Sequence, residues 1–197
     1  MRQIYSHKPG LLKPLPSKLN PNRKSGEILL LHGKKGFGAS HFLVTELVQK
    51  NASVHLIDCA IRFDIFQITS TLKNESLLDN LLIQRAFTPY QILDSTKQIS
   101  LSKVNREAFY FYLAPFKQFF DGDVKPDEAE FLLKKLIREF ASLKNSGVHL
   151  VIAEKEKYSS KIFPEAMNSL RSIASQEMNL VSLPEKLSDA DLFGEFF

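Results

Sequence analysis

The chain has 197 residues, 44% of them hydrophobic and 24% charged, with a formal net charge of +4 at pH 7. This composition fits one globular domain, and no apolar run approaches the roughly 18 residues of a membrane span. The single cysteine, Cys59, excludes an internal disulfide framework and a multi-cysteine metal site. We therefore expect an intracellular protein with no membrane partner, cytoplasmic or, in a eukaryote, nuclear.

Residues 1–25 form a basic leader. Lys and Arg are the only charged residues of its first 24 positions, and four prolines interrupt it. A basic arm suits nucleic acid or another acidic surface. The alternative is a weakly ordered, solvated leader.

Apolar strand patterns and helical patterns then alternate along the chain. Buried strands alternating with helices indicate an α/β fold, with a central, mainly parallel sheet flanked by helices on both faces. We predict one core domain at residues 26–184, followed by an acidic and aromatic tail at residues 185–197. The predicted strands are 28–31, 54–57, 79–83, 108–113, 148–153 and 179–183, and the predicted helices are 40–50, 63–72, 89–99 and 127–144.

The segment 33–40 reads GKKGFGAS and lies between a predicted strand and a predicted helix. It is close to the phosphate-binding loop GxxxxGK[ST], whose backbone amides and lysine hold nucleotide phosphates. Ala39 stands at the lysine position and Ser40 at the position of the magnesium-binding hydroxyl. Gly33, Gly38 and Ser40 are therefore candidates for a vestigial nucleotide site, in which Lys34 or Lys35 would replace the missing lysine. The alternative is a tight strand-to-helix turn.

From Gly26 to Leu183 the sequence resembles the core of the RecA/RadA recombinase family. The most specific match is LLDNLLIQRAFTPYQ at residues 77–91, which is similar to the family pattern LDNVxxxRAFxxxxQ. Residues 54–63 resemble the family's second strand, and residues 108–116 stand where its Walker B strand lies. Residues 148–157 and 173–183 resemble the strands that enter and leave its second DNA-binding loop. The resemblance implies a RecA-like P-loop NTPase fold.

The departures from the family pattern imply a protein that is not an enzyme. The Walker B aspartate corresponds to Ala114, and the glutamate that polarises the attacking water corresponds to Ala60. With Ala39, the groups that position cations and water for phosphoryl transfer are missing. We expect no catalytic residue, no bound metal and no required cofactor, although residual binding of ATP and magnesium stays open. Asp58 and Asp64 are alternative carboxylates, but we interpret Asp58 as a strand-end residue bonded to a neighbouring loop.

The resemblance places two DNA-binding loops on one face of the protein. The first, residues 117–127, is rich in aspartate and offers a poor phosphate surface. The second, residues 154–171, combines basic residues with Tyr158 and Phe163, a pattern that fits single-stranded DNA better than double-stranded DNA. The alternative is a charged loop with its aromatic rings in the core. The candidate DNA-binding residues are Lys155, Lys157, Lys161 and Arg171.

The C-terminal tail ends in SDADLFGEFF, residues 188–197. It resembles the short tails by which replication and repair proteins bind sliding clamps, except that Asp189 or Ala190 replaces their initial glutamine. Apolar side chains on such a tail can fill a preformed pocket. The alternative is a tail that folds back on its own core. The candidate partner-binding residues are Leu192, Phe193, Phe196 and Phe197.

Three functional hypotheses follow from these observations. The first is a non-catalytic RecA/RadA-like paralogue, an accessory factor in DNA recombination or repair that binds DNA, a RecA-type recombinase, or both. The second is an ATPase that uses Lys34 or Lys35. The third is a protein-interaction module that docks on a sliding clamp or a recombinase through its tail.

Overall fold

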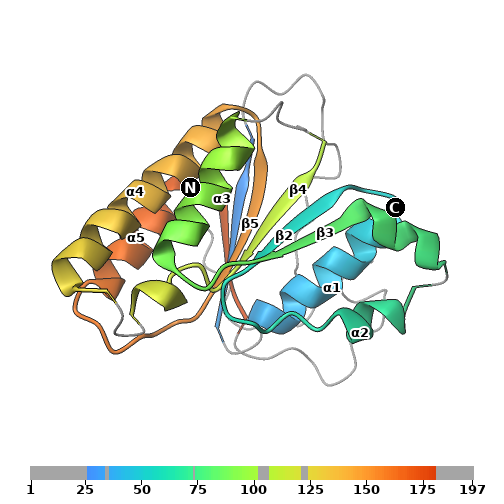
Figure 1. The fold of residues 1–197 in the computed structure, drawn as a ribbon, viewed down its shortest axis with the longest axis horizontal. Coiled ribbons are helices and arrows are strands. Elements are labelled where there is room, and N and C mark those ends of the chain that lie inside the picture. The colour runs from blue at the N-terminus through green and yellow to red at the C-terminus, as the bar shows by residue number, and fades with distance from the viewer. Residues whose placement is uncertain (1–25, 34–35, 73, 102–106, 121–123, 181–197) are drawn as a thin grey trace.

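The computed structural model describes residues 26–33, 36–72, 74–101, 107–120 and 124–180. It contains a six-stranded, all-parallel sheet with the strand order β3-β2-β4-β5-β1-β6 (Figure 1). The strands are β1 (Ile28–His32), β2 (Val54–Asp58), β3 (Leu81–Arg85), β4 (Phe109–Leu113), β5 (His149–Glu154) and β6 (Gln176–Asn179). The predicted α/β class with a parallel sheet is confirmed.

Helices cover both faces of the sheet, as parallel strands with two apolar faces require (Figure 1). One face packs against α1, and the other packs against α3, α4 and α5. The helices are α1 (Gly36–Gln49), α2 (Ile65–Thr69), α3 (Pro89–Leu101), α4 (Pro126–Asn145) and α5 (Phe163–Ile173), with short 3₁₀ turns at Glu75–Asn80 and Lys117–Phe119.

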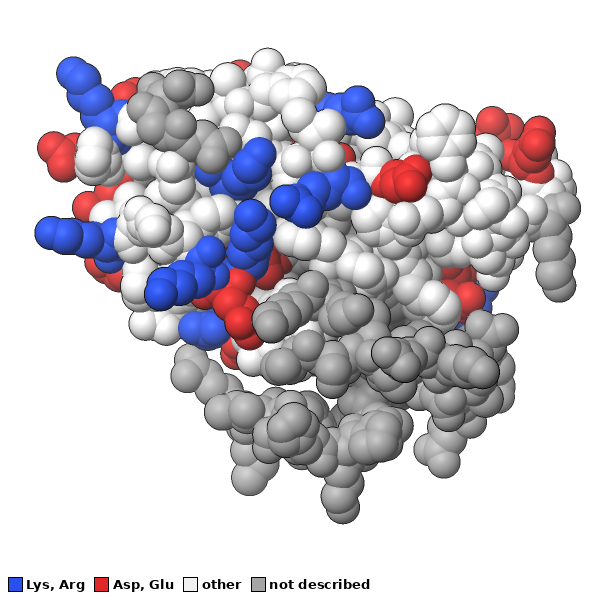
Figure 2. Space-filling model, turned by 90° about the horizontal axis from the view of Figure 1, so that it is seen from below, with Lys and Arg blue, Asp and Glu red and all other residues white. Residues whose placement is uncertain are grey.

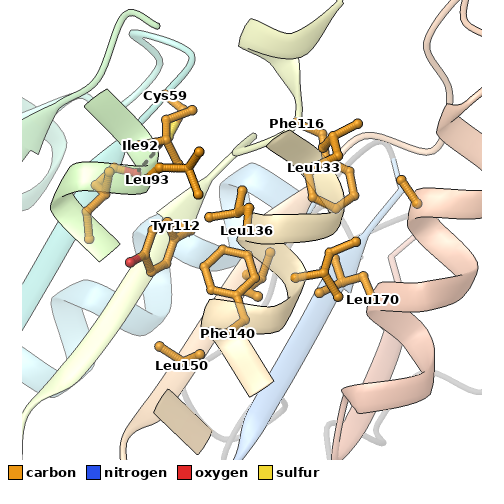
Figure 3. Packing of buried hydrophobic residues seen from close by; sticks show 14 of the residues in the cluster. Cys59, Ile92, Leu93, Tyr112, Phe116, Leu133, Leu136, Phe140, Leu150 and Leu170 are labelled. Atoms are coloured by element: carbon orange, nitrogen blue, oxygen red, sulfur yellow. Dashed lines mark hydrogen bonds between the residues drawn. The ribbon is translucent and has the colours of Figure 1, made fainter. Parts of the chain in front are cut away.

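The larger core cluster lies under α3, α4 and α5. All five residues of β4 are buried, and Tyr112 in this strand packs edge-on against Phe140 of α4, with ring centroids 4.8 Å apart (Figure 3). The Tyr112 hydroxyl donates a hydrogen bond to Thr96 Oγ1 over 3.0 Å, which satisfies its only buried polar group. Burying side chains of this size contributes about 2–3 kcal/mol each. These contacts hold the middle strands in place, and the strand ends carry the candidate site.

Several element boundaries differ from the sequence prediction. The predicted helix 40–50 begins earlier, at Gly36, and the predicted helix 63–72 is limited to Ile65–Thr69, where Asp64 accepts a hydrogen bond from the Phe66 amide and caps it. The predicted strand 79–83 begins instead at Leu81, because the residues before it form a 3₁₀ turn.

The largest correction concerns residues 154–171, which were predicted as an open loop. Helix α5 occupies Phe163–Ile173 within and beyond this range, and its apolar side recurs at Phe163, Ala166, Met167 and Leu170. The last strand is Gln176–Asn179 rather than 179–183, of which residues 181–183 lie outside the described part. The leader and the tail at residues 185–197 lie outside it too. None of the described helices has both the length and the apolar character needed to cross a bilayer.

Candidate functional site

All strands of the sheet are parallel, so their carboxyl ends meet at one edge, where ligand sites of α/β sheets usually lie. In Figure 1 the segment after β5 runs along the lower side of the molecule to α5, and Figure 2 views this side from below. The sequence-predicted nucleotide and DNA-binding segments both begin at this edge.

The turn after β1 is short and tight. Gly33 has a φ of +97°, and α1 starts at Gly36, whose amide donates to the Gly33 carbonyl over 3.2 Å. Five of the eight motif positions therefore belong to α1. Gly38 is exposed on this helix, whereas Ser40 is fully buried and its hydroxyl donates to the Gly36 carbonyl over 3.0 Å. The described residues adopt a tight strand-to-helix turn, with the Ser40 hydroxyl bonded inside the helix. Lys34 and Lys35 lie outside the described residues.

Asp58, at the end of β2, organises the loop that follows it. Its buried carboxylate accepts hydrogen bonds from the amides of Ala60, Arg62 and Phe63, at 2.9 to 3.2 Å. The interpretation of Asp58 as a strand-end residue bonded to a neighbouring loop is confirmed. Both of its oxygen atoms accept hydrogen bonds from the backbone, so Asp58 holds the loop.

Ala114, the residue that corresponds to the Walker B aspartate, follows β4 in a left-handed conformation with a φ of +49°. Its amide donates to the Ala153 carbonyl over 2.7 Å, so β4 stays attached to β5 up to this point. Two residues later, the amide of Phe116 points to the end of β5 and donates to Glu154.

Glu154, the last residue of β5, is a functional candidate that the sequence reasoning did not single out. Its side chain is buried, with 1% exposure, and accepts hydrogen bonds from the amides of Phe116 and Lys155 and from the Tyr158 hydroxyl. Burial raises the pKa of Glu154 from 4.5 to about 7, although these donors favour the charged form. The available signal was a glutamate directly after the apolar run LVIA, at residues 150–153.

The aromatic residues of this segment belong to the core. Phe163 is buried, and Tyr158 and Phe120 pack around it with ring centroids 5.0 and 5.9 Å from its own. This arrangement confirms the alternative in which the aromatic rings lie in the core and the charges lie on the loop. These rings anchor the loop, with Phe163 buried and Tyr158 half-buried.

Three of the four predicted DNA-binding residues lie on one short loop. Lys157 and Lys161 are exposed, and half-buried Lys155 has its Nζ 5.4 Å from the centroid of the Tyr158 ring. Lys and Arg side chains gather on the described part of this face, with acidic residues among them (Figure 2). The loop therefore presents several cations at the carboxyl edge of the sheet.

Arg171 lies apart from these lysines, in the last turn of α5, about 15 Å along the helix from the loop. Its Nε donates to Glu177 Oε1 over 2.7 Å. His32 Nε2 lies 2.9 Å from the same oxygen, and burial lowers the pKa of His32. Arg171 is thus part of an ion pair between α5 and β6 rather than part of the lysine loop.

The predicted tail residues Leu192, Phe193, Phe196 and Phe197 lie outside the described part of the chain. Within residues 26–180, as far as they are described, His, Cys, Asp and Glu side chains form no group of three or more suited to a metal ion. No family model and no curated protein sequence matches the chain.

Proposed function

We propose that this protein is a non-catalytic, RecA-like accessory factor in DNA recombination or repair, which binds DNA through the loop that follows β5. The observation that carries the proposal is the set of Lys155, Lys157 and Lys161 on a loop at the carboxyl edge of the sheet, anchored by the buried Phe163 ring and the half-buried Tyr158 ring. Lysines held near one another can neutralise successive phosphates and release counterions.

We propose that the protein is not catalytic because of the residues at the same edge of the sheet. The positions that correspond to the family's lysine, aspartate and glutamate are Ala39, Ala114 and Ala60, and all three are buried. Ser40 and Asp58, the remaining polar groups of the two motifs, are bonded to the backbone. Phosphoryl transfer requires positioned cations and an oriented nucleophile, and none of these side chains supplies them.

Because Phe163 is buried and half-buried Tyr158 packs against it, we expect DNA binding to depend on phosphates more than on base stacking. The predicted preference for single-stranded DNA rested on those rings, so we expect single and double strands to bind with similar affinity. This expectation is tested by using both kinds of DNA.

The test is a fluorescence-anisotropy titration of labelled single- and double-stranded oligonucleotides over a range of salt, with and without ATP and magnesium. A Lys157→Ala/Lys161→Ala variant is compared with Lys50→Ala/Lys97→Ala, which removes the same charge from the turn after α1 and from α3. We expect the first pair to weaken binding about tenfold and to reduce the salt slope by about 0.7 per lost contact on single strands. The control pair should bind as the wild type does, and ATP should change nothing. Absence of binding at low salt would refute the proposal.

The second hypothesis, an ATPase that uses Lys34 or Lys35, is tested by magnesium-dependent phosphate release. We expect none above background from the wild type. Release that disappears in a Lys34→Ala/Lys35→Ala variant would support the ATPase instead.

A protein partner is the second candidate function, and exposed apolar side chains favour it. Phe66 is 79% exposed, and Ile61, Phe87, Tyr90 and Phe131 are each at least half exposed. Exposed aromatic residues are typical anchors of protein interfaces. We propose a RecA-type recombinase as this partner. A Phe66→Ser/Phe87→Ser variant should no longer bind the recombinase in a pull-down. A separate Leu192→Ala/Phe193→Ala variant tests binding of a sliding clamp through the tail.

A further inference from the structure

Glu154 joins two loops that are far apart in the sequence. Its Oε2 accepts a hydrogen bond from the amide of Phe116, in the segment after β4, over 2.8 Å. Its Oε1 accepts hydrogen bonds from the Lys155 amide and the Tyr158 hydroxyl, in the segment after β5, each over 2.7 Å. One carboxylate therefore fixes the starting points of both loops.

The contacts lie immediately beside the cations of this edge. Lys117 follows Phe116 in the chain, Lys155 supplies one of the donors, and Lys157 precedes Tyr158. The ring of Tyr158 also packs against Phe120, with centroids 5.3 Å apart, so the two segments touch through side chains as well. The relative positions of these lysines therefore depend on the hydrogen bonds by which Glu154 joins the segments after β4 and β5.

A buried carboxylate without an ion-pair partner is costly for stability alone. Among the described side chains, none forms an ion pair with Glu154, and its partners are two amides and one hydroxyl. Burying a charge in this way is unfavourable unless donors compensate for the lost water. An apolar residue at the end of β5 would avoid the free-energy cost of burying a carboxylate, but it would accept none of the three hydrogen bonds.

We propose that Glu154 is a positioning residue, which holds the loops after β4 and β5 in one arrangement and so sets the spacing of Lys117, Lys155 and Lys157 for the DNA backbone. The proposal rests on the proposed DNA-binding function of this edge. Glu154 acts through the backbone and through Tyr158, and it does not itself contact DNA.

The effect of a Glu154 substitution on DNA affinity has opposite signs for a positioning role and for a purely electrostatic role. Glu154→Gln removes a negative charge below the lysines, which by electrostatics alone would strengthen DNA binding. A positioning role predicts weaker binding, about tenfold at pH 8, because the amide group of Gln accepts hydrogen bonds through only one atom. Glu156→Gln is the matched control, since it removes the same charge from an exposed residue two positions away and should strengthen binding about twofold.

Tyr158→Phe is the second variant, and it keeps the ring that packs on Phe120 and Phe163 while removing one donor to Glu154. We expect its DNA affinity to fall two- to threefold, with an unchanged circular dichroism spectrum. This variant keeps the proposal testable if Glu154→Gln fails to fold.

The pH profile of DNA binding gives an independent readout. The titratable groups that face Glu154 are Lys155 and Tyr158 in its own loop, Cys59 at the end of β2, and His32, its register neighbour on β1. Protonated Glu154 would lose an acceptor atom, so wild-type affinity should fall as the pH is lowered from 8 to 6. The affinity of Glu154→Gln should stay constant and match the wild type at pH 6.

Amide hydrogen exchange of full-length protein without DNA separates the two proposals. Because Gln keeps one accepting oxygen, we expect at least one of the amides of Phe116 and Lys155 to exchange at least tenfold faster in Glu154→Gln than in the wild type at pH 8. Unchanged exchange at both amides would overturn the role of Glu154, whatever the DNA does. Faster exchange combined with DNA binding as tight as that of Glu156→Gln would also overturn it. A wild type that binds no DNA would refute the proposed function instead.

Discussion

A Cβ atom at Gly33 would lie 2.7 Å from Asn179 Oδ1, so the turn after β1 and the end of β6 leave no room for a side chain. The backbone carbonyl of Leu180 would be equally close, at 2.8 Å, and the φ of +97° disfavours any L-residue. This contact joins segments almost 150 positions apart. Gly33 is therefore required by packing and by backbone conformation, independently of any nucleotide.

The first prediction is that Gly33→Ala destabilises the protein by about 2 kcal/mol or more, because it adds both strain and a clash. Gly38→Ala is the control. Gly38 is exposed within α1, where Ala is about 0.5–1 kcal/mol more favourable than Gly, so this variant should be stabilised. Chemical denaturation monitored by circular dichroism measures both changes. Equal effects of the two variants would contradict the tight turn described here.

The second prediction concerns the loop held by Asp58. Asp58→Ala leaves three amides without their acceptor, at least two of them in buried residues, and should lower the free energy of unfolding by about 3 kcal/mol. Asp64→Ala removes only the cap of the short helix α2 and should cost about 1 kcal/mol. Thermal unfolding of the two variants provides the measurement. A loss at Asp58 no larger than that at Asp64 would show that the loop is held by other contacts.

The third prediction is a pH dependence of stability that comes from Glu154. Its pKa is raised to about 7 in the folded protein, so the folded state binds more protons than the unfolded state between pH 4.5 and 7. Stability should therefore fall as the pH rises through this window, by up to about 3 kcal/mol, and level off above it.

Denaturation midpoints at pH 5, 6, 7 and 8 test this prediction. The Glu154→Gln variant has no group to titrate at this position and should lack that decrease. A wild type whose midpoint follows that of the Gln variant at every pH would show that the carboxyl group is solvated.

The fourth prediction concerns strain at Ile61. This β-branched residue has a φ of +54°, and its side chain is 55% exposed. Asn tolerates the left-handed conformation better, so Ile61→Asn should stabilise the protein by about 1 kcal/mol. Ile61→Val keeps the branched side chain and the strain, and should leave stability nearly unchanged. A less stable Asn variant would indicate that the Ile61 side chain contributes packing in solution.

Much of the fold could be predicted from local pattern, because buried strands and amphipathic helices repeat apolar residues at their own periods. The predicted bounds of β4 and α4, residues 108–113 and 127–144, each lie within one residue of the observed bounds. Helix α5 carries the same kind of signal at Phe163, Ala166, Met167 and Leu170, but the resemblance to the family's second DNA-binding loop led to the prediction of an open loop.

The candidate site was predicted less completely. The sequence placed Lys155, Lys157 and Lys161 on one loop, and the structure has them there. The ion pair of Arg171 with Glu177 could not be predicted, because the sequence does not show where the strand β6, which carries Glu177, lies in the sheet. The sequence also could not single out Glu154, whose donors lie partly on a segment 38 residues away.

The sequence by itself determined the alternation of strands and helices, the parallel class of the sheet, and the basic character of the loop after β5. These properties depend on the spacing and type of residues that are neighbours in the chain. Only the tertiary structure decided the strand order, the packing of Gly33 against β6, and the meeting of two loops at Glu154. Each of these depends on pairing between distant segments, where many arrangements satisfy the same local pattern and only packing and hydrogen bonding select one.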